Sequence, residues 1–440
     1  MYTLLLLTFV VGYFCIALEH PLKIDKTASA LLTGVLCWTV LVMGQEALFP
    51  GGVAPGLLEE TILLHVGEIA EILFFLLGAM TIVELIDTHG GFQVITERIR
   101  TTDRVKLLWI LGFVTFFLSA VLDNLTTTIV MATLLKKLIR DKEDLWFFGG
   151  MVVIAANAGG AWSPIGDVTT IMLWIGGQVT APSIVAGLLL PSLVCLLAPL
   201  AVLSFTKRGS VSPPSRFDLE NGGGGGLHHQ PVAVSPGEAS LVLWLGIIAL
   251  LFVPVFKTVT HLPPFMGMLL SLGVLWVVTE LLHKRKPEDE RHSLSVAGVI
   301  RRVDTPSILF FLGILLAVAS LQTAGHLSQM AVILNDTFGN IYVINLIIGL
   351  VSAIVDNVPL VAGAMGMYSL ADYPQDSNFW TFLAYCAGTG GSSLIIGSAA
   401  GVAIMGLLKI DFIWYLKRIT WLALVGYFAG AVVYYLQHGL

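Results

Sequence analysis

Charged residues are scarce in this chain. Asp, Glu, Lys and Arg make up 12% of its 440 residues, about half of the roughly 25% that is usual in soluble domains. Hydrophobic residues make up 56%, and the mean hydropathy is +0.88. This composition excludes a soluble globular protein and predicts a polytopic membrane protein in contact with the lipid bilayer. The net charge of −6 says little about partners, because most charges lie in loops, and we expect no nucleic-acid partner.

Cysteine frameworks and enzyme motifs are lacking as well. Cys15, Cys37, Cys195 and Cys386 all lie in apolar runs without metal-ligand spacing, so they predict neither a disulfide framework nor a zinc site. No His-Glu-x-x-His zinc motif is present. The stretch Pro164-Ile165-Gly166-Asp167 lacks the first glycine of the Gly-x-Gly-Asp motif of intramembrane aspartyl proteases. These absences argue against an enzyme, and we expect no cofactor.

Long apolar runs fill most of the chain, and about 20 apolar residues cross a bilayer as a helix. By this measure we predict ten spans, at residues 2–18, 27–48, 62–86, 146–178, 183–205, 240–258, 264–282, 305–322, 379–408 and 412–436. Residues 107–139 and 341–370 instead each contain two shorter apolar arms joined at an Asp-Asn pair. An arm of about 14 residues is about 21 Å long, too short for a hydrocarbon core of about 30 Å. Each segment is therefore predicted to be a re-entrant hairpin.

Basic residues in the loops predict the orientation, because cytoplasmic loops are enriched in Lys and Arg. Both flanks of the first hairpin are basic, whereas residues 322–340 and 371–378, which flank the second, contain no Lys or Arg. The first hairpin is thus expected to enter from the cytoplasm and the second from outside. Ten spans and two hairpins then place both termini outside, and we expect the inner (cytoplasmic) membrane of a bacterium.

The chain is predicted to consist of two related halves. A glycine-rich cytoplasmic linker at 206–239 separates residues 1–205 from residues 240–440. The run Ile72-Leu73-Phe74-Phe75-Leu76 recurs at 308–312, and the Gly159-Gly160 pair recurs at 390–391. Each half holds five spans and one hairpin, and because five is odd the halves enter the membrane from opposite sides. The predicted fold is therefore an all-α inverted repeat, a common plan of secondary transporters.

Each predicted hairpin carries an Asp-Asn pair at its tip. Asp123 and Asp356 each follow a serine by four residues, Ser119 and Ser352. A charge at membrane depth costs several kcal/mol and usually has a function. In each half the span after the hairpin contains a glycine-rich stretch, at 156–170 and 387–398. Glycine and proline are expected to unwind these spans, and unwound backbone at membrane depth lines a cavity or is buried in protein.

The tips and the helix breaks are expected to meet near the membrane midplane and to form one cation site in each half. Carboxylate, hydroxyl, amide and freed carbonyl oxygens are the ligands that a hard cation such as Na⁺ prefers. The predicted cation- and proton-binding residues are Ser119, Asp123, Asn124, Thr126, Thr127, Asn157, Ser163, Asp167 and Thr169 in the first half and Ser352, Asp356, Asn357, Thr389, Ser392 and Ser393 in the second. Na⁺ itself is expected at the two Asp-Asn pairs. Glu68 and Glu71 share one face of the third span and are predicted to be either a proton path, a pH-sensing element or simply interfacial.

No Lys or Arg lies within residues 107–135, 146–180, 341–370 or 379–408. A site for an anion would need positive charge, whereas three aspartates without a base suit a cation that competes with protons. Burial favours the protonated form of a carboxylate, and a like charge nearby favours it further. Simpler explanations stay open: the aspartates could be helix caps, and the glycine pairs could be close-packing positions.

These motifs resemble those of the NhaD-type sodium/proton antiporters of the ion transporter superfamily. The resemblance is carried by SAVLDNLTTTIV, NAGGAWSPIGDVTTIMLW, SAIVDNVPL and GTGGSSLIIGSAAGV. Dicarboxylate carriers of the wider superfamily have Ser-Asn-Thr at the hairpin tips, where this chain has Asp-Asn in both halves. The resemblance implies a homodimer and an elevator, in which residues 107–205 and 341–438 move against a scaffold of residues 1–86 and 240–322. It also implies exchange that is strongest at alkaline pH.

The leading hypothesis is a secondary transporter that exchanges cytoplasmic Na⁺ or Li⁺ for external H⁺. Asp123 and Asp356 would bind the cation and the protons in turn. The alternative is a Na⁺-coupled symporter of anions such as dicarboxylates or citrate, or a metalloid exporter, on the same fold. A channel is a further alternative, which the two discontinuous sites disfavour.

Overall fold

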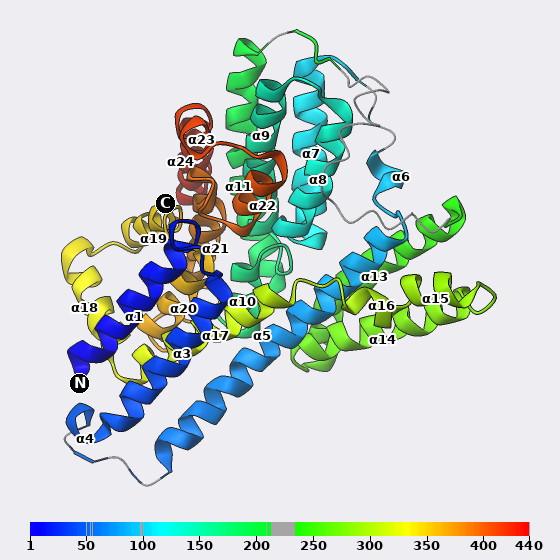
Figure 1. Ribbon diagram of the computed structural model, residues 1–440. Coiled ribbons are helices and arrows are strands. Elements are labelled where there is room, and N and C mark those ends of the chain that lie inside the picture. The colour runs from blue at the N-terminus through cyan, green and yellow to red at the C-terminus, as the bar shows by residue number, and fades with distance from the viewer. Residues whose placement is uncertain are drawn as a thin grey trace.

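The protein is described by a computed structural model over residues 1–49, 51–52, 54, 56–96, 99, 101–207, 209–212 and 234–439. The regular elements in these residues are helices (Figure 1). Most of the linker predicted at 206–239 lies outside the described residues.

The chain forms two series of helices, one on each side of the linker. The first series is α1 (Tyr2–Ala17), α2 (Glu19–Leu22), α3 (Lys26–Met43), α4 (Gln45–Leu48), α5 (Leu57–Thr88), α6 (Gln93–Thr96), α7 (Arg104–Leu122), α8 (Asn124–Leu138), α9 (Lys142–Ala161), α10 (Val168–Ile175) and α11 (Ala181–Thr206). The second series is α13 (Pro236–Thr260), α14 (Pro264–Leu282), α15 (Glu288–Leu294), α16 (Val296–Ile300), α17 (Thr305–Thr323), α18 (His326–Phe338), α19 (Ile341–Val351), α20 (Asn357–Met367), α21 (Asn378–Gly390), the 3₁₀ turn η1 (Gly391–Ser393), α22 (Ala399–Leu408), α23 (Phe412–Arg418) and α24 (Thr420–His438).

Among the described residues, nine helices are long and apolar enough to cross a membrane, or up to eleven if each of two bent pairs counts as one span. This confirms an all-helical, polytopic membrane protein. The expected length of the hairpin arms is wrong for α7, which has 19 residues and is itself one of the nine. At about 1.5 Å per residue it is about 28 Å long. The second arm, α8, has 15 residues.

Two segments differ from the predicted spans and loops. Residues 412–436 were expected to form one span, but they contain α23 and α24, and α23 is bent by 117° from α22. The stretch 322–340 was expected to be a loop, but it contains α18, which is bent by 117° from α19. The bend has a local cause, because Gly339 has a positive φ of 59° and ends α18. The side chain of Asn340 then accepts a hydrogen bond from the Tyr342 N–H at 2.8 Å and starts α19.

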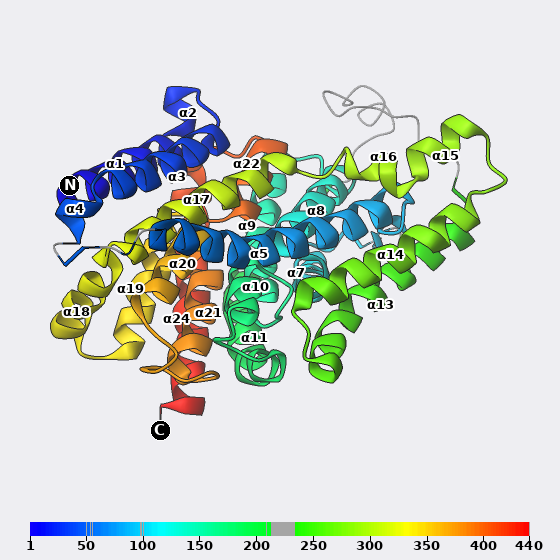
Figure 2. The same cartoon turned by 90° about the horizontal axis from the view of Figure 1, so that it is seen from below.

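Helices of the first series pack against helices of the second. α3 packs against α17, α5 against α14, and α11 against α24. The indole Nε1 of Trp38 on α3 donates a hydrogen bond to the Leu316 carbonyl of α17 at 2.9 Å. In the view of Figure 2, α9 and α10 lie near the middle of the molecule, between α18 and α19 on one side and α13 and α14 on the other. The two series therefore form one interleaved body with α9 and α10 near its centre.

Aspartates start several of the helices that surround this centre. The carboxylates of Asp25, Asp103 and Asp141 accept hydrogen bonds from backbone N–H groups in the first turns of α3, α7 and α9. Such caps satisfy donors that have no partner inside the helix and are typically worth about 1 kcal/mol each. They also fix the residue at which each helix begins, so that Lys26 is the first residue of α3.

Two buried histidines lie where α5 and α14 end. The rings of His89 and His283 stack with centroids 5.0 Å apart and planes 20° apart. Nδ1 of His89 lies 2.7 Å from the Leu85 carbonyl, so that nitrogen carries the proton. Burial lowers the pKa of His89 to about 4 and also lowers the pKa of His283. Both rings are therefore neutral near pH 7.

Candidate cation site

Asp123 is the single residue between α7 and α8. Its backbone has φ of 116° and ψ of 161°, a region that essentially only glycine adopts without strain, at a cost of about 1–3 kcal/mol for other residues. The side chain accepts hydrogen bonds from the backbone N–H of Thr126 at 2.7 Å and from the Thr126 hydroxyl at 2.9 Å. It caps α8 while remaining half-buried. The capping explanation thus describes part of what Asp123 does.

The carboxylate of Asp167 is the centre of a buried polar network. Asp167 is 1% exposed, and it accepts hydrogen bonds from the backbone N–H of Thr169 at 2.8 Å and from the Thr169 hydroxyl at 2.7 Å. Nδ2 of Asn124, at the first tip, donates to it at 2.5 Å. Nδ2 of Asn357, at the second tip, lies 3.5 Å from it. Both asparagines that follow the tip aspartates therefore point at one carboxylate.

Asn157 connects the first half to the second. Its Oδ1 accepts a hydrogen bond from Asn124 at 3.1 Å. Its Nδ2 donates to the hydroxyls of Ser392 and Ser398, both at 2.9 Å. Asn157 is fully buried, so removal of its side chain would leave several polar groups without partners, at about 1–3 kcal/mol each.

The predicted carboxylates share one small cavity. A cavity of about 60 Å³ is lined by Asp123, Asn124, Asp167, Asp356 and Asn357, together with apolar side chains of α5 and α17. We call it the central cavity. Sequence reasoning expected a separate site in each half, whereas the structure gives both tips and the first break a common cavity. Asp356 itself caps α20 through the Val358 N–H at 3.3 Å.

The predicted serines of the first arms hold the hairpins to the broken helices. The hydroxyl of Ser119 donates to the Ala156 carbonyl of α9 at 2.6 Å. The hydroxyl of Ser352 lies 2.7 Å from the Gly349 carbonyl and 3.3 Å from the Ala387 carbonyl of α21. Ser163 in turn donates to the Ala120 carbonyl of α7 at 2.5 Å. In this conformation these three hydroxyls form hydrogen bonds that connect the hairpins with the broken helices.

Three further predicted residues lie outside the hydrogen-bonded network. Thr389 donates to the carbonyl of Tyr385 within its own helix at 2.6 Å. The hydroxyls of Thr127 and Ser393 are buried without a hydrogen-bond partner among the described residues. None of the three lines the central cavity as the described residues define it.

Both spans are interrupted inside the glycine-rich stretches 156–170 and 387–398, as predicted, but the irregular backbone follows the glycine pairs rather than coinciding with them. α9 continues through Gly159-Gly160 to Ala161 and α21 runs to Gly390, so the irregular stretches come later, at 162–167 and 394–398. A Cβ at Gly159 would lie 2.2 Å from the Phe116 carbonyl oxygen, and one at Gly390 would lie 2.0 Å from the Gly349 carbonyl oxygen. The glycines therefore let the hairpins pack directly on the broken helices, which is the close-packing alternative.

Two larger clefts flank the central cavity. The Glu84 cleft, of about 460 Å³, is lined by Glu84 and Asp87 of α5, by Arg302 and Asp304, and by apolar residues of α8 and α22. The Glu71 cleft, of about 380 Å³, is lined by His65, Glu68 and Glu71 of α5 and by residues of α10, α17 and α20. The predicted glutamates thus lie together in one cleft, where Nδ1 of His65 is 3.3 Å from Glu68.

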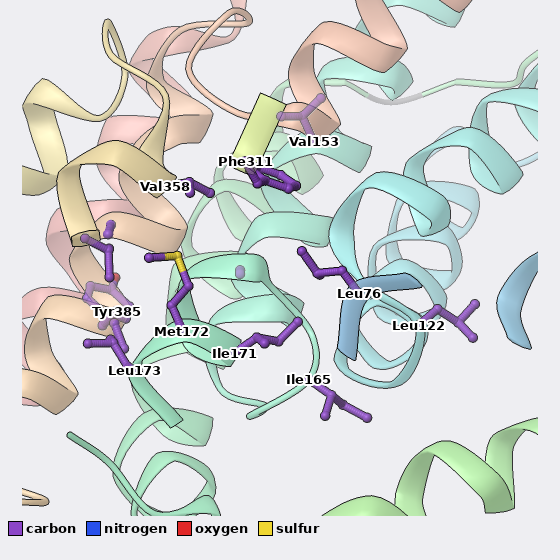
Figure 3. Close-up of a cluster of buried hydrophobic side chains, with 14 of the residues drawn as sticks. Leu76, Leu122, Val153, Ile165, Ile171, Met172, Leu173, Phe311, Val358 and Tyr385 are labelled. Atoms are coloured by element: carbon purple, nitrogen blue, oxygen red, sulfur yellow. The ribbon is translucent and has the colours of Figure 1, made fainter. Parts of the chain in front are cut away.

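The central cavity is joined to one of these clefts and separated from the other. It shares Lys26, Met80, Leu125, Ser307 and Ala399 with the Glu84 cleft. Among the described residues, none lines both the central cavity and the Glu71 cleft. Figure 3 shows buried apolar side chains of this region, of which Leu76, Ile171, Phe311 and Val358 line the central cavity and Met172 lines the Glu71 cleft. The central cavity therefore adjoins the Glu84 cleft in this conformation.

Comparison with known proteins identifies the family. A family model described as a citrate transporter matches residues 13–382. The chain is 48% identical over 438 residues to "Sodium/proton antiporter 1" of Arabidopsis thaliana, covering 99% of this chain and 72% of that protein. It is 45% identical to "Sodium/proton antiporter 2" of the same plant, covering 98% and 99%. It is 30% identical to the "Na(+)/H(+) antiporter NhaD" of Alkalimonas amylolytica, covering 97% and 88%. The chain belongs to the NhaD-type ion transporter family.

The NhaD-type relatives are multi-pass membrane transporters, and this chain is a transporter rather than an enzyme. Plants as well as bacteria carry such proteins. The family assignment therefore agrees with the resemblance in the sequence motifs, but it does not decide the host membrane.

Sequence reasoning missed two residues at the site of this NhaD-type transporter. Ser398 caps α22 and binds Asn157, and it lies 231 positions after Asp167, the same offset that relates Gly159 to Gly390. Following the repeat one residue beyond Gly397 would have found it. Lys26 lines the central cavity although it lies far from both hairpins in the sequence. Residues 107–135, 146–180, 341–370 and 379–408 lack a base, but the candidate site as a whole has one.

Proposed function

We propose that the chain exchanges Na⁺ or Li⁺ for H⁺, with the central cavity as the common binding site. The observation that carries this proposal is the meeting of Asp123, Asp167 and Asp356 in one small cavity together with two asparagine amides. Carboxylates and amide oxygens suit a hard cation, and three carboxylates in a confined space cannot all stay ionised without one. The names of the plant and bacterial relatives support the same conclusion.

The proposed cycle uses competition between a cation and protons. Na⁺ enters through the Glu84 cleft and replaces protons on the carboxylates. The displaced protons leave by the same route. After the site has become accessible from the other side, external protons displace Na⁺, and the protonated carrier returns. The transported ions are the only reactants, so the cycle requires no cofactor.

We further propose that alternating access is an elevator movement of an inverted repeat. α5 and α17 line the central cavity and both clefts. The opposite wall changes along the path: α8 and α22 line the Glu84 cleft, and α10 and α20 line the Glu71 cleft. α8 packs against α22, and α10 packs against α20. We call each of these helix pairs a unit; each unit combines a hairpin arm of one half with the helix after the break in the other half. A shift of these units along α5 and α17 would close one cleft and open the other.

The remaining parts of the proposal concern the assembly. Residues 107–205 and 341–438 form the mobile part, residues 1–86 and 240–322 form the scaffold, and two copies form a homodimer. The face with the Glu84 cleft carries Lys26 and Arg302, and we propose that it faces the cytoplasm, where basic residues are enriched. Both termini are then external. The proposed location is the inner membrane of a bacterium.

The test is Na⁺-induced dequenching of acridine orange in proteoliposomes, from about pH 6.5 to about pH 9.5 so as to bracket the titration of buried carboxylates. Wild-type protein is expected to respond to Na⁺ or Li⁺, Asp123→Asn to lose the response, and Asp336→Asn to keep it. Asp336 is an exposed residue of α18 and provides a charge-matched control. A folded wild-type protein without any response would refute the exchange, and an active Asp123→Asn would refute the role of the tip.

The anion alternative retains two specific observations in its favour. The matching family model is described as a citrate transporter, and Lys26 provides a positive charge at the cavity. One lysine against three carboxylates leaves the cavity with a surplus of negative charge, so we favour the cation. Uptake of labelled citrate driven by a Na⁺ gradient would decide for the alternative.

A further inference from the structure

Lys26 lies where the Glu84 cleft meets the central cavity. It lines both spaces, and its Nζ lies 4.7 Å from the centroid of the Phe310 ring, within the range of a cation–π interaction. Phe310 also lines the central cavity. The ammonium group is thus held at the opening through which a cation would reach the carboxylates.

The carboxylates around Lys26 do not neutralise it by direct contact. Among the residues that the structure describes, Lys26 takes part in no ion pair. The charged side chains that share a cavity with it are Glu84 and Asp87 of α5, Asp123 at the first tip, Asp167 before α10, Arg302 and Asp304 before α17, and Asp356 before α20. Acidic groups therefore outnumber basic ones, and Lys26 is the basic group that reaches the central cavity within the described residues.

We propose that Lys26 provides a fixed positive charge at the mouth of the site. This charge competes with the transported cation and with protons for electrostatic interaction with the three carboxylates. This inference rests on the proposed Na⁺/H⁺ exchange. A positive charge near a carboxylate favours its ionised form and also repels a second cation. Lys26 thus weakens the binding of both Na⁺ and H⁺. It sets the Na⁺ concentration and the pH at which exchange begins.

The two effects predict opposite changes when the charge is removed. In Lys26→Met, at about pH 9, where protons compete little, half-maximal exchange is expected at about three- to tenfold less Na⁺, the order expected for one unit charge at the edge of a site of intermediate dielectric. Near pH 7 the same variant is expected to be less active than wild type, because protons now bind more tightly. The acid limb of its activity profile moves to higher pH by about half a unit to one unit, the logarithm of the same factor.

The experiment measures Na⁺-dependent exchange in proteoliposomes for wild type, Lys26→Met, Lys26→Arg and Lys284→Met. Lys26→Arg keeps the charge and should resemble wild type. Lys284 is exposed and lines neither cavity, so Lys284→Met controls for loss of one basic residue. A loss of packing alone would lower the maximal rate of Lys26→Met without the opposite changes at the two pH values.

The outcomes separate this inference from the proposed function. Wild-type protein without Na⁺-dependent exchange would refute the function, whereas active wild type with unchanged Na⁺ dependence and pH profile in Lys26→Met would refute only the role of Lys26. So would a Lys26→Arg that behaves like Lys26→Met. If transport by Lys26→Met is too slow to measure, the rise in melting temperature with Na⁺ reports binding directly, and tighter binding at about pH 9 is the expected result. Lys26→Gln repeats the test if Lys26→Met does not fold.

Discussion

The stacked pair of His89 and His283 predicts that the protein loses stability in mild acid. Burial lowers the pKa of His89 to about 4, whereas a histidine in an unfolded chain has a pKa of about 6.5. Between about pH 6.5 and pH 4, His89 is therefore mostly protonated in the unfolded state and mostly neutral in the folded state. The stabilisation is fully present above about pH 6.5 and is lost as the pH falls from 6.5 towards 4. By proton linkage, His89 alone lowers the free energy of unfolding by about 2 kcal/mol between pH 8 and pH 5.

The variant His89→Asn tests this prediction. The amide of asparagine can still donate to the Leu85 carbonyl, but it does not titrate. Melting can be followed in detergent by tryptophan fluorescence, because Trp174 and Trp380 are buried in the folded protein. We expect the drop in melting temperature between pH 8 and pH 5 to be smaller in His89→Asn than in wild type by about 3 °C, given a few degrees per kcal/mol in large proteins.

The readout is the difference between two pH values, so a general loss of packing in the variant does not affect it. His292→Asn serves as the control, since His292 is exposed and should leave the pH dependence unchanged. The reasoning would be refuted if His89→Asn kept the full acid sensitivity of wild type. His283, whose pKa is lowered as well, should account for part of the sensitivity that remains.

Three further changes have expected outcomes. Asp167→Asn places an amide opposite the Asn124 amide, so exchange should be lost and the free energy of unfolding should fall by about 1–3 kcal/mol, as a melting curve would show; an active variant would contradict the network. Asn157→Ala should raise the Na⁺ concentration for half-maximal exchange by about tenfold, since a lost hydrogen bond of about 1.4 kcal/mol corresponds to that factor; an unchanged Na⁺ titration would remove Asn157 from the site. Gly159→Ala would bring a methyl group within 2.2 Å of a hairpin carbonyl and should abolish folding or exchange, measured by gel filtration and dequenching, whereas Gly406→Ala, where no atom lies within 4 Å, should behave as wild type.

The main features of the fold follow from patterns that are local in the sequence. Apolar runs of span length and the two Asp-Asn pairs predict where most helices and both tips lie. The repeat places equivalent residues at equivalent contacts, as Ser119 and Ser352 illustrate by donating to the broken helix of their own half. What the chain does at 162–167 could be predicted only roughly, because glycine inside a helix is compatible both with a break and with close packing. The neighbouring carbonyl of Phe116, 43 residues away, favours packing.

The residues that sequence reasoning missed depend on long-range packing. No local pattern connects Lys26 with the tip at Asp123, because α3 reaches the site only by packing against α17. The meeting of both tips in one cavity is likewise a property of the interleaved halves. Asn357 reaches Asp167 across 190 residues of sequence, which the order of motifs along the chain does not reveal.

The backbone of Asp123 has a practical consequence for anyone who wishes to study the empty carrier. Because its φ of 116° suits glycine, Asp123→Gly relieves local strain worth about 1–3 kcal/mol while it deletes the carboxylate and one helix cap. If Asp123 binds the transported ions as proposed, function and stability make opposite demands at this one position. On the proposed function, a glycine there is expected to give a protein that does not transport and whose stability is close to that of the parent, because the relieved strain offsets the lost cap. Such a protein would serve as a reference sample for ion-binding and imaging experiments.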